Sequence, residues 1–307
     1  MQNKDCILGI DTSNYTTSVA VTDKHGDIIA DARKVLHVKE GEKGLRQSEA
    51  FFQHIKALPE LMDLVMKESQ GYCLAGVSAS TRPRPTEGSY MPVFKAGESV
   101  GRSIALAQGI PFFDFSHQEG HIEAVKFYVD LEKLDEFLCF HLSGGTCEIL
   151  KVKNREIEII GGSKDISIGQ LLDRVGVGLN LKFPAGEEMD RMALTQESSS
   201  IFKKVELDQL WFNLSGIETM ALRNLKTEGI STELFEKLSD LLIRLANKAV
   251  KETKISSVIF AGGVSESKYI RNQIQKALTC QVGFGRSNLS RDNAVGISLL
   301  GGRCLWP

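Results

Sequence analysis

The sequence predicts an α/β protein built from two related lobes. The chain has 307 residues, roughly twice the length of an average domain, which favours two packed lobes. Two segments, residues 7–23 and 138–154, each read as a strand, a short turn rich in Ser, Thr or Gly, and a second strand. Apolar strands alternate with helical patterns along the rest of the chain, which is typical of α/β folds. The two similar hairpins predict a duplicated core, one copy in each lobe.

The first lobe is expected to cover residues 1–115. After the hairpin, residues 48–69 carry apolar side chains at helical spacing, with Ser48 as the expected N-cap. Residues 74–80 form an apolar strand, and the next helical pattern closes at Gly109. A further helix that bears two histidines is expected to follow directly.

The second lobe is expected to cover residues 116–307 and alternates in the same way. Helical patterns cover residues 167–181 and 231–251, and a third follows a buried strand over residues 256–264. No low-complexity segment or long linker separates the lobes, so short connections between them are expected. The C-terminal helix is expected to pack back toward the first lobe.

Composition argues against several classes of protein. A formal net charge of −2 predicts no strong electrostatic attraction to nucleic acid by the chain as a whole. Six cysteines without a CxxC pair argue against a disulfide framework and a thiolate zinc site, and favour a reducing compartment. The N-terminal residues lack a secretory apolar region, and no stretch approaches about 18 unbroken apolar residues. We expect a soluble, cytoplasmic protein that makes no membrane contact.

His117 and His121 are candidate metal ligands. Four residues apart on a helix, they differ by about 40° in azimuth, so both imidazoles can face one ion. Surface or capping histidines show the same spacing by chance, so the pair alone does not decide. A zincin-type protease is disfavoured, because Gln118 stands where that motif has glutamate and Glu119 points about 200° away from His117.

Two glycine pairs are candidate phosphate-binding turns. Gly144 and Gly145 lie in SGGT, and Gly262 and Gly263 lie in AGGV, each where a strand ends. Glycine lets backbone N–H groups approach a phosphate closely. Ordinary tight turns also contain glycine, but two such turns in this order favour a nucleotide bound between the lobes.

Six stretches in chain order make the sequence similar to the TsaD family, the transferases that make threonylcarbamoyladenosine in tRNA and were once called glycoproteases. They are ILGIDTS, SHQEGH, SGGT, GQLLDRVGVGLNLKFPAG, AGGVSESKYIR and SRDNAVGIS. The resemblance covers nearly the whole chain and identifies it as a diverged paralogue of that family. It implies the two-lobed actin and sugar-kinase (ASKHA) fold, with a nucleotide in the cleft.

The resemblance implies one iron or zinc ion, held by His117, His121 and Asp292. Archaeal relatives add a tyrosine ligand at the position of His141, which we propose as a fourth ligand, although a strand histidine bonded to a backbone carbonyl would look the same in sequence. Two imidazoles and a carboxylate suit either metal and leave positions open. In the family the metal holds the phosphate and carboxylate end of threonylcarbamoyl adenylate while the amine of adenine attacks the carbamoyl carbon.

The resemblance also implies the contacts of an adenine nucleotide or threonylcarbamoyl-AMP. Asp173 and Asp190 match ribose contacts, and Ser267 replaces an asparagine that pairs with adenine in the family. The expected nucleotide or substrate residues are Leu142, Ser143, Gly144, Gly145, Asp173, Gly186, Asp190, Gly262, Gly263 and Ser267.

Departures from the family pattern affect the reaction centre. Where the family reads ETSCDE this chain reads DTSNYT, so Tyr15 and Thr16 replace two acids and Asp11 remains the candidate catalytic residue. A flexible glycine-rich loop is replaced by residues 82–97, in which three prolines stiffen the chain and two arginines add charge. We therefore expect weaker transfer to tRNA than in the family's main enzymes.

Three hypotheses about function remain open on the sequence. The first is a metal-dependent, adenylate-using carbamoyl or threonylcarbamoyl transferase with tRNA adenosine as acceptor, and the retained ligands favour it. The second is a carbamoyltransferase retargeted to another acceptor. The third is a non-catalytic nucleotide-binding partner subunit like TsaB, although such relatives lack the histidine pair. A TsaB-like or TsaE-like protein partner is expected for the enzyme.

Overall fold

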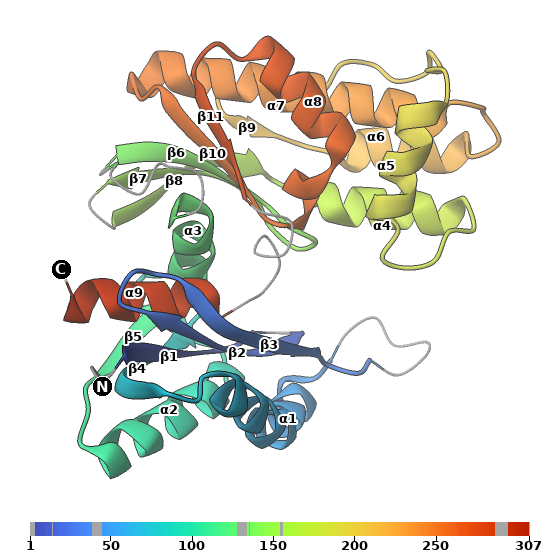
Figure 1. Ribbon diagram of the computed structural model, residues 1–307. Coiled ribbons are helices and arrows are strands. Elements are labelled where there is room, and N and C mark those ends of the chain that lie inside the picture. The colour runs from blue at the N-terminus through green and yellow to red at the C-terminus, as the bar shows by residue number, and fades with distance from the viewer. Residues whose placement is uncertain are drawn as a thin grey trace. The chain divides into compact units, whose positions relative to one another are not determined.

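The chain divides into two compact units (Figure 1), which are described separately. The computed structural model describes residues 4–13, 15–38, 45–127, 134, 136–153, 156–285 and 294–306. Unit 1 comprises Met1–Phe127 and Arg291–Pro307, and unit 2 comprises Tyr128–Ser290. This division differs from the expected boundary after residue 115, because the histidine-bearing helix packs within unit 1.

Unit 1 is built on a five-stranded sheet in the order β3-β2-β1-β4-β5. Its strands are β1 (Lys4–Thr12), β2 (Thr16–Asp23), β3 (Ile28–Val35), β4 (Tyr72–Arg82) and β5 (Phe112–Ser116). β2 is antiparallel to both β1 and β3, whereas β4 is parallel to β1 and β5. The hairpin of β1 and β2 confirms the strand–turn–strand predicted for residues 7–23.

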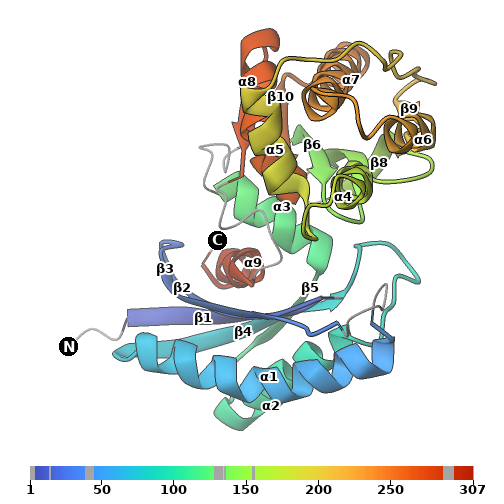
Figure 2. The same ribbon diagram turned by 90° about the vertical axis from the view of Figure 1, so that its right-hand side faces the viewer.

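Helices cover both faces of this sheet (Figure 2). α1 (Gln47–Glu68) and α2 (Phe94–Gln108) lie on one face, α9 (Val295–Leu305) lies on the other, and α3 (His117–Phe127) packs on α9. The α3–α9 crossing is close, since a Cβ added at Gly296 would lie 1.8 Å from the carbonyl oxygen of Gly120. Ser298 of α9 donates a hydrogen bond to the carbonyl oxygen of Ile7 at 2.9 Å, which ties α9 to β1.

The sequence predicts the end of α2 correctly but not the start of α1. Gly109 closes α2 in the left-handed conformation, with φ of 66°, as the sequence predicts. Ser48 is not the N-cap of α1, because the helix already begins at Gln47 and Arg46 occupies the capping position. A side-chain cap is therefore not what starts this helix.

Unit 2 is built on a six-stranded sheet in the order β11-β10-β6-β7-β8-β9. Its strands are β6 (Glu136–Leu142), β7 (Cys147–Lys153), β8 (Glu156–Ser163), β9 (Trp211–Phe212), β10 (Ser257–Ala261) and β11 (Gln281–Phe284). Along β8-β7-β6-β10-β11 the pairings are antiparallel, antiparallel, parallel and parallel. Unit 1 has the same sequence of pairings along β3-β2-β1-β4-β5, so the structure confirms the duplication that the repeated hairpins predict.

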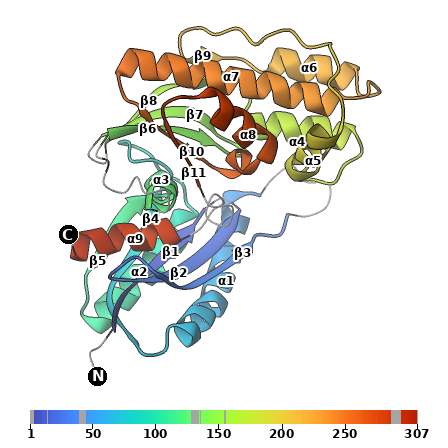
Figure 3. The same cartoon turned by 45° about the horizontal axis from the view of Figure 1, so that its top comes forward.

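The helices of unit 2 enclose its core with the sheet. They are α4 (Ile168–Gly178), α5 (Gly186–Thr195), α6 (Ser215–Arg223), α7 (Ile230–Thr253) and α8 (Lys268–Ala277), with a short 3₁₀ turn η1 (Gly263–Glu266) after β10. α7 and α8 lie side by side (Figure 3). Phe260 stacks between Phe140 and Phe284, at ring separations of 4.9 and 5.2 Å. Across the described residues, every helix is too short or too polar to cross a membrane.

Candidate functional site

The two predicted histidine ligands face each other on α3. Their Nε2 atoms lie 3.0 Å apart, and the rings meet edge to face at 4.4 Å between centroids. The helical spacing therefore does bring both imidazoles toward one point, as predicted for His117 and His121.

Asp11 fixes the orientation and the tautomer of His117. Its carboxylate is fully buried at the end of β1, and its two oxygens lie 3.0 and 3.1 Å from Nδ1 of His117. Since an ionised carboxylate can only accept, Nδ1 of His117 carries the proton and donates it. The Nε2 atom of His117 is then unprotonated and accepts the hydrogen bond from Nε2 of His121.

This arrangement fits a metal ligand pair. Two imidazole nitrogens bound to one tetrahedral zinc ion lie about 3.3 Å apart, given Zn–N bonds of about 2.0–2.1 Å, close to the observed 3.0 Å. A carboxylate on the far nitrogen of a ligating histidine is the usual outer support of such sites. Within the described ranges no group of three or more His, Cys, Asp and Glu side chains could hold a metal ion. Asp292 lies outside the described residues, and His141 is a buried residue of β6 in unit 2.

A buried histidine that the sequence did not single out supports the turn beside Asp11. His54 of α1 is fully buried; its Nε2 lies 2.7 Å from the carbonyl oxygen of Ser13 and its Nδ1 lies 2.7 Å from the hydroxyl of Thr17. A carbonyl can only accept, so Nε2 carries the proton and the Thr17 hydroxyl donates to Nδ1. Burial lowers the pKa of His54, although the Ser13 carbonyl and Asp11 oppose this. In the sequence, only the position of His54 among the apolar residues of α1 indicates that this histidine points inward.

The two glycine turns of unit 2 lie next to each other. β6 and β10 are neighbouring parallel strands with His141 opposite Ala261, so the turns that follow them meet at one edge of the sheet. A Cβ added at Gly262 would lie 2.3 Å from the carbonyl oxygen of Leu142. Gly262 also has φ of 88°, which only glycine adopts readily.

The other predicted glycines have room around them. A Cβ added at Gly144, Gly145, Gly186 or Gly263 would have no described atom within 4 Å. Packing within the protein therefore does not require glycine at these positions. The hydroxyl of Ser143 accepts hydrogen bonds from the backbone N–H groups of Gly145 and Thr146, which holds the first turn in shape.

Asp173 and Asp190, the predicted ribose contacts, each hold the start of a helix. Asp173 accepts from the backbone N–H of Ala185 at 2.8 Å, where α5 begins. Burial raises the pKa of Asp173, and the amides of Ala185 and Gly186 oppose the rise. Asp190 is buried and accepts from three groups at the start of α8. They are the hydroxyl of Ser267 and the backbone N–H groups of Lys268 and Tyr269.

Ser267 has a structural task in addition to the predicted adenine contact. Its hydroxyl caps α8 by accepting from the backbone N–H of Ile270 at 3.1 Å, and it donates to Asp190. A serine in place of the family's asparagine thus links α5 to the N-terminus of α8.

The segment over residues 82–97, predicted from the sequence as one loop, runs from the last residue of β4 into the first turn of α2 and is tied to the rest of unit 1 at both ends. Arg82 forms an ion pair with Asp114 at 2.8 Å, so its charge is compensated. At the other end the hydroxyl of Thr12 donates to the carbonyl oxygen of Val93 and accepts from the N–H of Gly97. The expected stiff loop thus joins α2 to the end of β1, where Asp11 lies.

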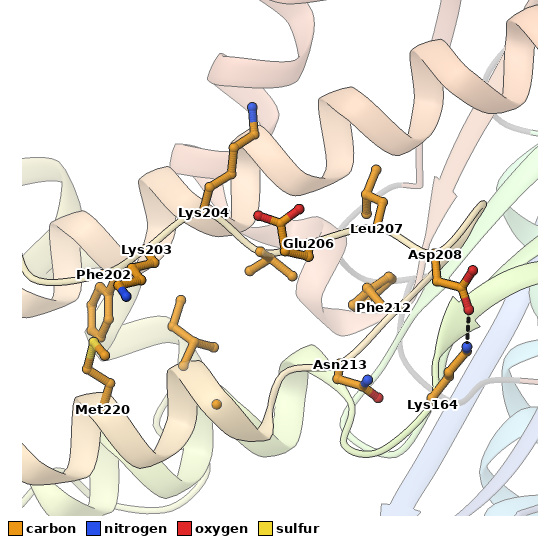
Figure 4. A pocket seen from close by; sticks show the side chains of 13 residues that line it. Lys164, Phe202, Lys203, Lys204, Glu206, Leu207, Asp208, Phe212, Asn213 and Met220 are labelled. Carbon is orange, nitrogen blue, oxygen red and sulfur yellow. Dashed lines mark hydrogen bonds and ion pairs between the residues drawn. The ribbon is translucent and has the colours of Figure 1, made fainter.

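A separate hollow of unit 2 has a volume of about 440 Å³. Figure 4 shows side chains that line it, both charged and apolar, with Lys164 and Asp208 joined by an ion pair. None of the predicted site residues lines it. The lining residues are Lys164, Phe202, Lys203, Lys204, Val205, Glu206, Leu207, Asp208, Phe212, Asn213, Gly216, Ile217 and Met220.

Comparison with known proteins defines the class of the chain. The model of the TsaD family, described as tRNA N6-adenosine threonylcarbamoyltransferase, matches residues 28–299. A relative with that name from Halalkalibacterium halodurans is 27% identical over 294 residues, which cover 90% of this chain and 83% of the relative. Another relative with that name, from Sulfurihydrogenibium sp., is 27% identical over 311 residues, which cover 96% of this chain and 89% of the relative. The chain belongs to the TsaD family of transferases, as its motifs predicted.

Solved structures confirm the predicted fold class. HypF from T. kodakarensis matches with a TM-score of 0.64 at 13% identity, covering 98% of this chain and 48% of HypF. A ROK family glucokinase from Streptomyces griseus matches with a TM-score of 0.56 at 13% identity, covering 97% of this chain and 99% of the glucokinase. The chain spans about half the length of the HypF chains that it matches. These likenesses bear on the fold alone, and they confirm the actin and sugar-kinase class.

The buried His54 predicts a pH-dependent stability. Because its folded pKa lies below the ordinary value of 6.5, the unfolded chain takes up a proton first as the pH falls. The free energy of unfolding should then drop by up to about 1.4 kcal/mol per pH unit below about pH 6.5, until the folded pKa is reached. Denaturant titrations of the parent and of His54→Gln between pH 5 and 8 measure this slope. The variant should lose it, and the exposed-site control His25→Gln should keep it; equal slopes in the parent and His54→Gln would contradict the assignment.

Proposed function

We propose that this chain transfers a threonylcarbamoyl group from threonylcarbamoyl adenylate to adenosine in tRNA. The facing Nε2 atoms of His117 and His121, 3.0 Å apart at the position of the family's metal ligands, carry the proposal. The family match over residues 28–299 and the names of the relatives support this acceptor. They do not favour a retargeted carbamoyltransferase or a non-catalytic partner subunit.

In this proposal the histidine pair holds one iron or zinc ion, with Asp292 and His141 as further ligands. The bound ion would supply Lewis-acid polarisation and a template for the phosphate and carboxylate end of the adenylate. Asp11 keeps the His117 ring in place and keeps its proton on Nδ1, so that the unprotonated Nε2 can bind the ion in place of the proton that it shares with His121. This contact favours a positioning role for Asp11 over the catalytic role predicted from the sequence.

The adenylate is assigned to the glycine turns of unit 2. A Cβ added at Gly144, Gly145 or Gly263 would meet no described atom within 4 Å, so the turns leave room beside the backbone for phosphate oxygens. The N–H of Gly145 already donates to the hydroxyl of Ser143, so the N–H groups assigned to the phosphate are those of Gly144 and Gly263. In the transfer, the amine of adenine in tRNA attacks the carbamoyl carbon, the bond from that carbon to the phosphate oxygen breaks, and AMP leaves while the amine loses a proton. Amide N–H groups aimed at the leaving phosphate stabilise the charge that develops there.

The proposed reaction also has consequences for the compartment and the protein partner of the chain. Transfer to tRNA places the protein in the cytoplasm. A TsaB-like or TsaE-like subunit is the proposed protein partner, because Tyr15 and Thr16 stand where the family has acids and a partner could complete the site.

Reconstituted transfer tests the proposed function. The chain is combined with threonylcarbamoyl adenylate, TsaB-like and TsaE-like subunits and an unmodified tRNA transcript, and the nucleosides of the digested tRNA are measured by mass spectrometry. Threonylcarbamoyladenosine should form with the parent. His117→Ala combined with His121→Ala should lower the yield at least about a hundredfold, since metal Lewis-acid assistance amounts to several kcal/mol. Absence of the modified nucleoside with the parent would leave the retargeted transferase as the better account.

Metal analysis tests the histidine pair without any need for activity. The purified parent should contain about one iron or zinc ion per chain, and His117→Ala with His121→Ala should lose it. Asp11→Asn should weaken metal affinity about 10- to 100-fold, because the outer carboxylate no longer fixes the His117 ring. An unchanged metal content in the double variant would exclude the pair as ligands, whereas the exposed His25→Ala serves as the control that keeps the ion.

Gly263→Val should abolish nucleotide binding without disturbing the fold. A Cβ added at Gly263 meets no described protein atom within 4 Å, and Gly263 does not adopt a positive φ. The valine would instead occupy the space assigned to phosphate. Calorimetry with AMP should show binding by the parent and by the control Gly216→Val, whose added Cβ also has open space. Equal affinity in Gly263→Val would remove the phosphate assignment from this turn.

A further inference from the structure

The loop that joins α4 to α5 presents an exposed aromatic ring. We call residues Leu179–Ala185 the Phe183 loop. The side chain of Phe183 is 74% exposed, more than any other aromatic side chain among the described residues. Its neighbours Lys182 and Pro184 are exposed as well. Single exposed apolar side chains are common on protein surfaces, so exposure alone assigns nothing.

The Phe183 loop is held in place on both sides of the ring. Before it, the N–H of Leu181 donates to the carbonyl oxygen of Gly176 at 2.9 Å, and the side chain of Leu181 packs against the core of unit 2. After it, Ala185 is buried and its N–H donates to the carboxylate of Asp173 at 2.8 Å. The ring therefore stays in solvent on an anchored backbone, where a ligand that buries it would gain the hydrophobic free energy of its apolar surface.

The position of the loop indicates what the ring is for. The carboxylate that anchors it, Asp173, is a predicted ribose contact, and Gly186, the first residue after the loop, is another predicted nucleotide residue with open space before it. A flat apolar ring three residues before Gly186, on a loop anchored to Asp173, can stack on a base, because every base offers a π-face. Lys182 forms no ion pair within the described residues, so its ammonium group is available for a phosphate.

We propose that Phe183 is a stacking platform for a nucleobase at this site, with Lys182 contacting the adjoining phosphate. This inference rests on the proposed function, which brings two nucleobases to the protein: the adenine of the adenylate and the unpaired bases of the acceptor RNA. Both offer the same chemistry to the ring. Stacking on an anchored aromatic costs little conformational entropy, since the ring has only two rotatable bonds and its backbone is already fixed.

Binding measurements on the full-length protein distinguish the two sources. Affinities for AMP and for an unmodified tRNA transcript are measured for the parent, Phe183→Ala and Phe183→Trp. The alanine variant should bind one of the two ligands about 5- to 150-fold more weakly, the range that base stacking supplies, and the tryptophan variant should keep the parent affinity. Weaker AMP binding assigns the base to the adenylate. Weaker tRNA binding with unchanged AMP binding assigns it to the acceptor, and Lys182→Ala should then also reduce the salt dependence of tRNA binding.

Phe52→Ala is the matched control, because Phe52 is also an exposed phenylalanine, at 53%, but lies on α1 of unit 1. It should bind both ligands as the parent does. Thermal unfolding should be the same for parent and Phe183→Ala, since the exposed ring contributes little to the fold. Parent-like binding of both ligands by Phe183→Ala would overturn the inference. The proposed function would survive that result if the parent still transfers to tRNA and Gly263→Val still loses AMP.

Discussion

The contact between Asp11 and His117 is the constraint on which the candidate centre of unit 1 depends. A fully buried carboxylate is costly unless it is hydrogen-bonded, and here its charge is directed at a single imidazole nitrogen. That contact settles the tautomer of His117 and turns its other nitrogen toward His121. Two further hydrogen bonds hold the residues that follow Asp11. The buried His54 donates to the carbonyl oxygen of Ser13, and the hydroxyl of Thr12 accepts from the N–H of Gly97 at the start of α2. Loss of any of these hydrogen bonds would disturb the backbone at the end of β1, where Asp11 lies.

Unit 2 uses two carboxylates differently, the half-buried Asp173 and the buried Asp190. Asp173 and Asp190 are both directed at helix N-termini, where unsatisfied backbone N–H groups and the helix dipole favour a negative charge. Each carboxylate oxygen has two lone pairs, so a structural contact does not prevent a second one to a ribose hydroxyl. A ligand at these carboxylates would therefore bind to groups whose positions the protein has already fixed, which lowers the entropic cost of binding.

The duplicated topology explains why the candidate site residues gather at strand ends. In unit 1 the end of β1 carries Asp11, and in unit 2 the end of the equivalent strand β6 is followed by the turn of Gly144 and Gly145. The parallel neighbour β10 ends at the second glycine turn. Because parallel strands bring their carboxyl ends to one edge of a sheet, segments about 120 residues apart in the chain become neighbours there. HypF and a ROK family glucokinase share this architecture, so the fold by itself does not define the chemistry of this chain.

The sequence alone determined the α/β class, the duplicated hairpins and the family, because these depend on local periodicity and on motifs of a few residues. It also placed His117 and His121 on one face of a helix, since that needs only helical geometry. Only the tertiary structure decided that Asp11 orients His117, that Ser267 and Asp190 tie α5 to α8, and that His54 supports the first turn. The histidine-bearing helix likewise joined unit 1 because it packs on α9, from the far end of the chain. Each of these depends on contacts between residues distant in sequence, and such contacts leave no periodic signal because their partners are fixed by how the sheets and helices pack.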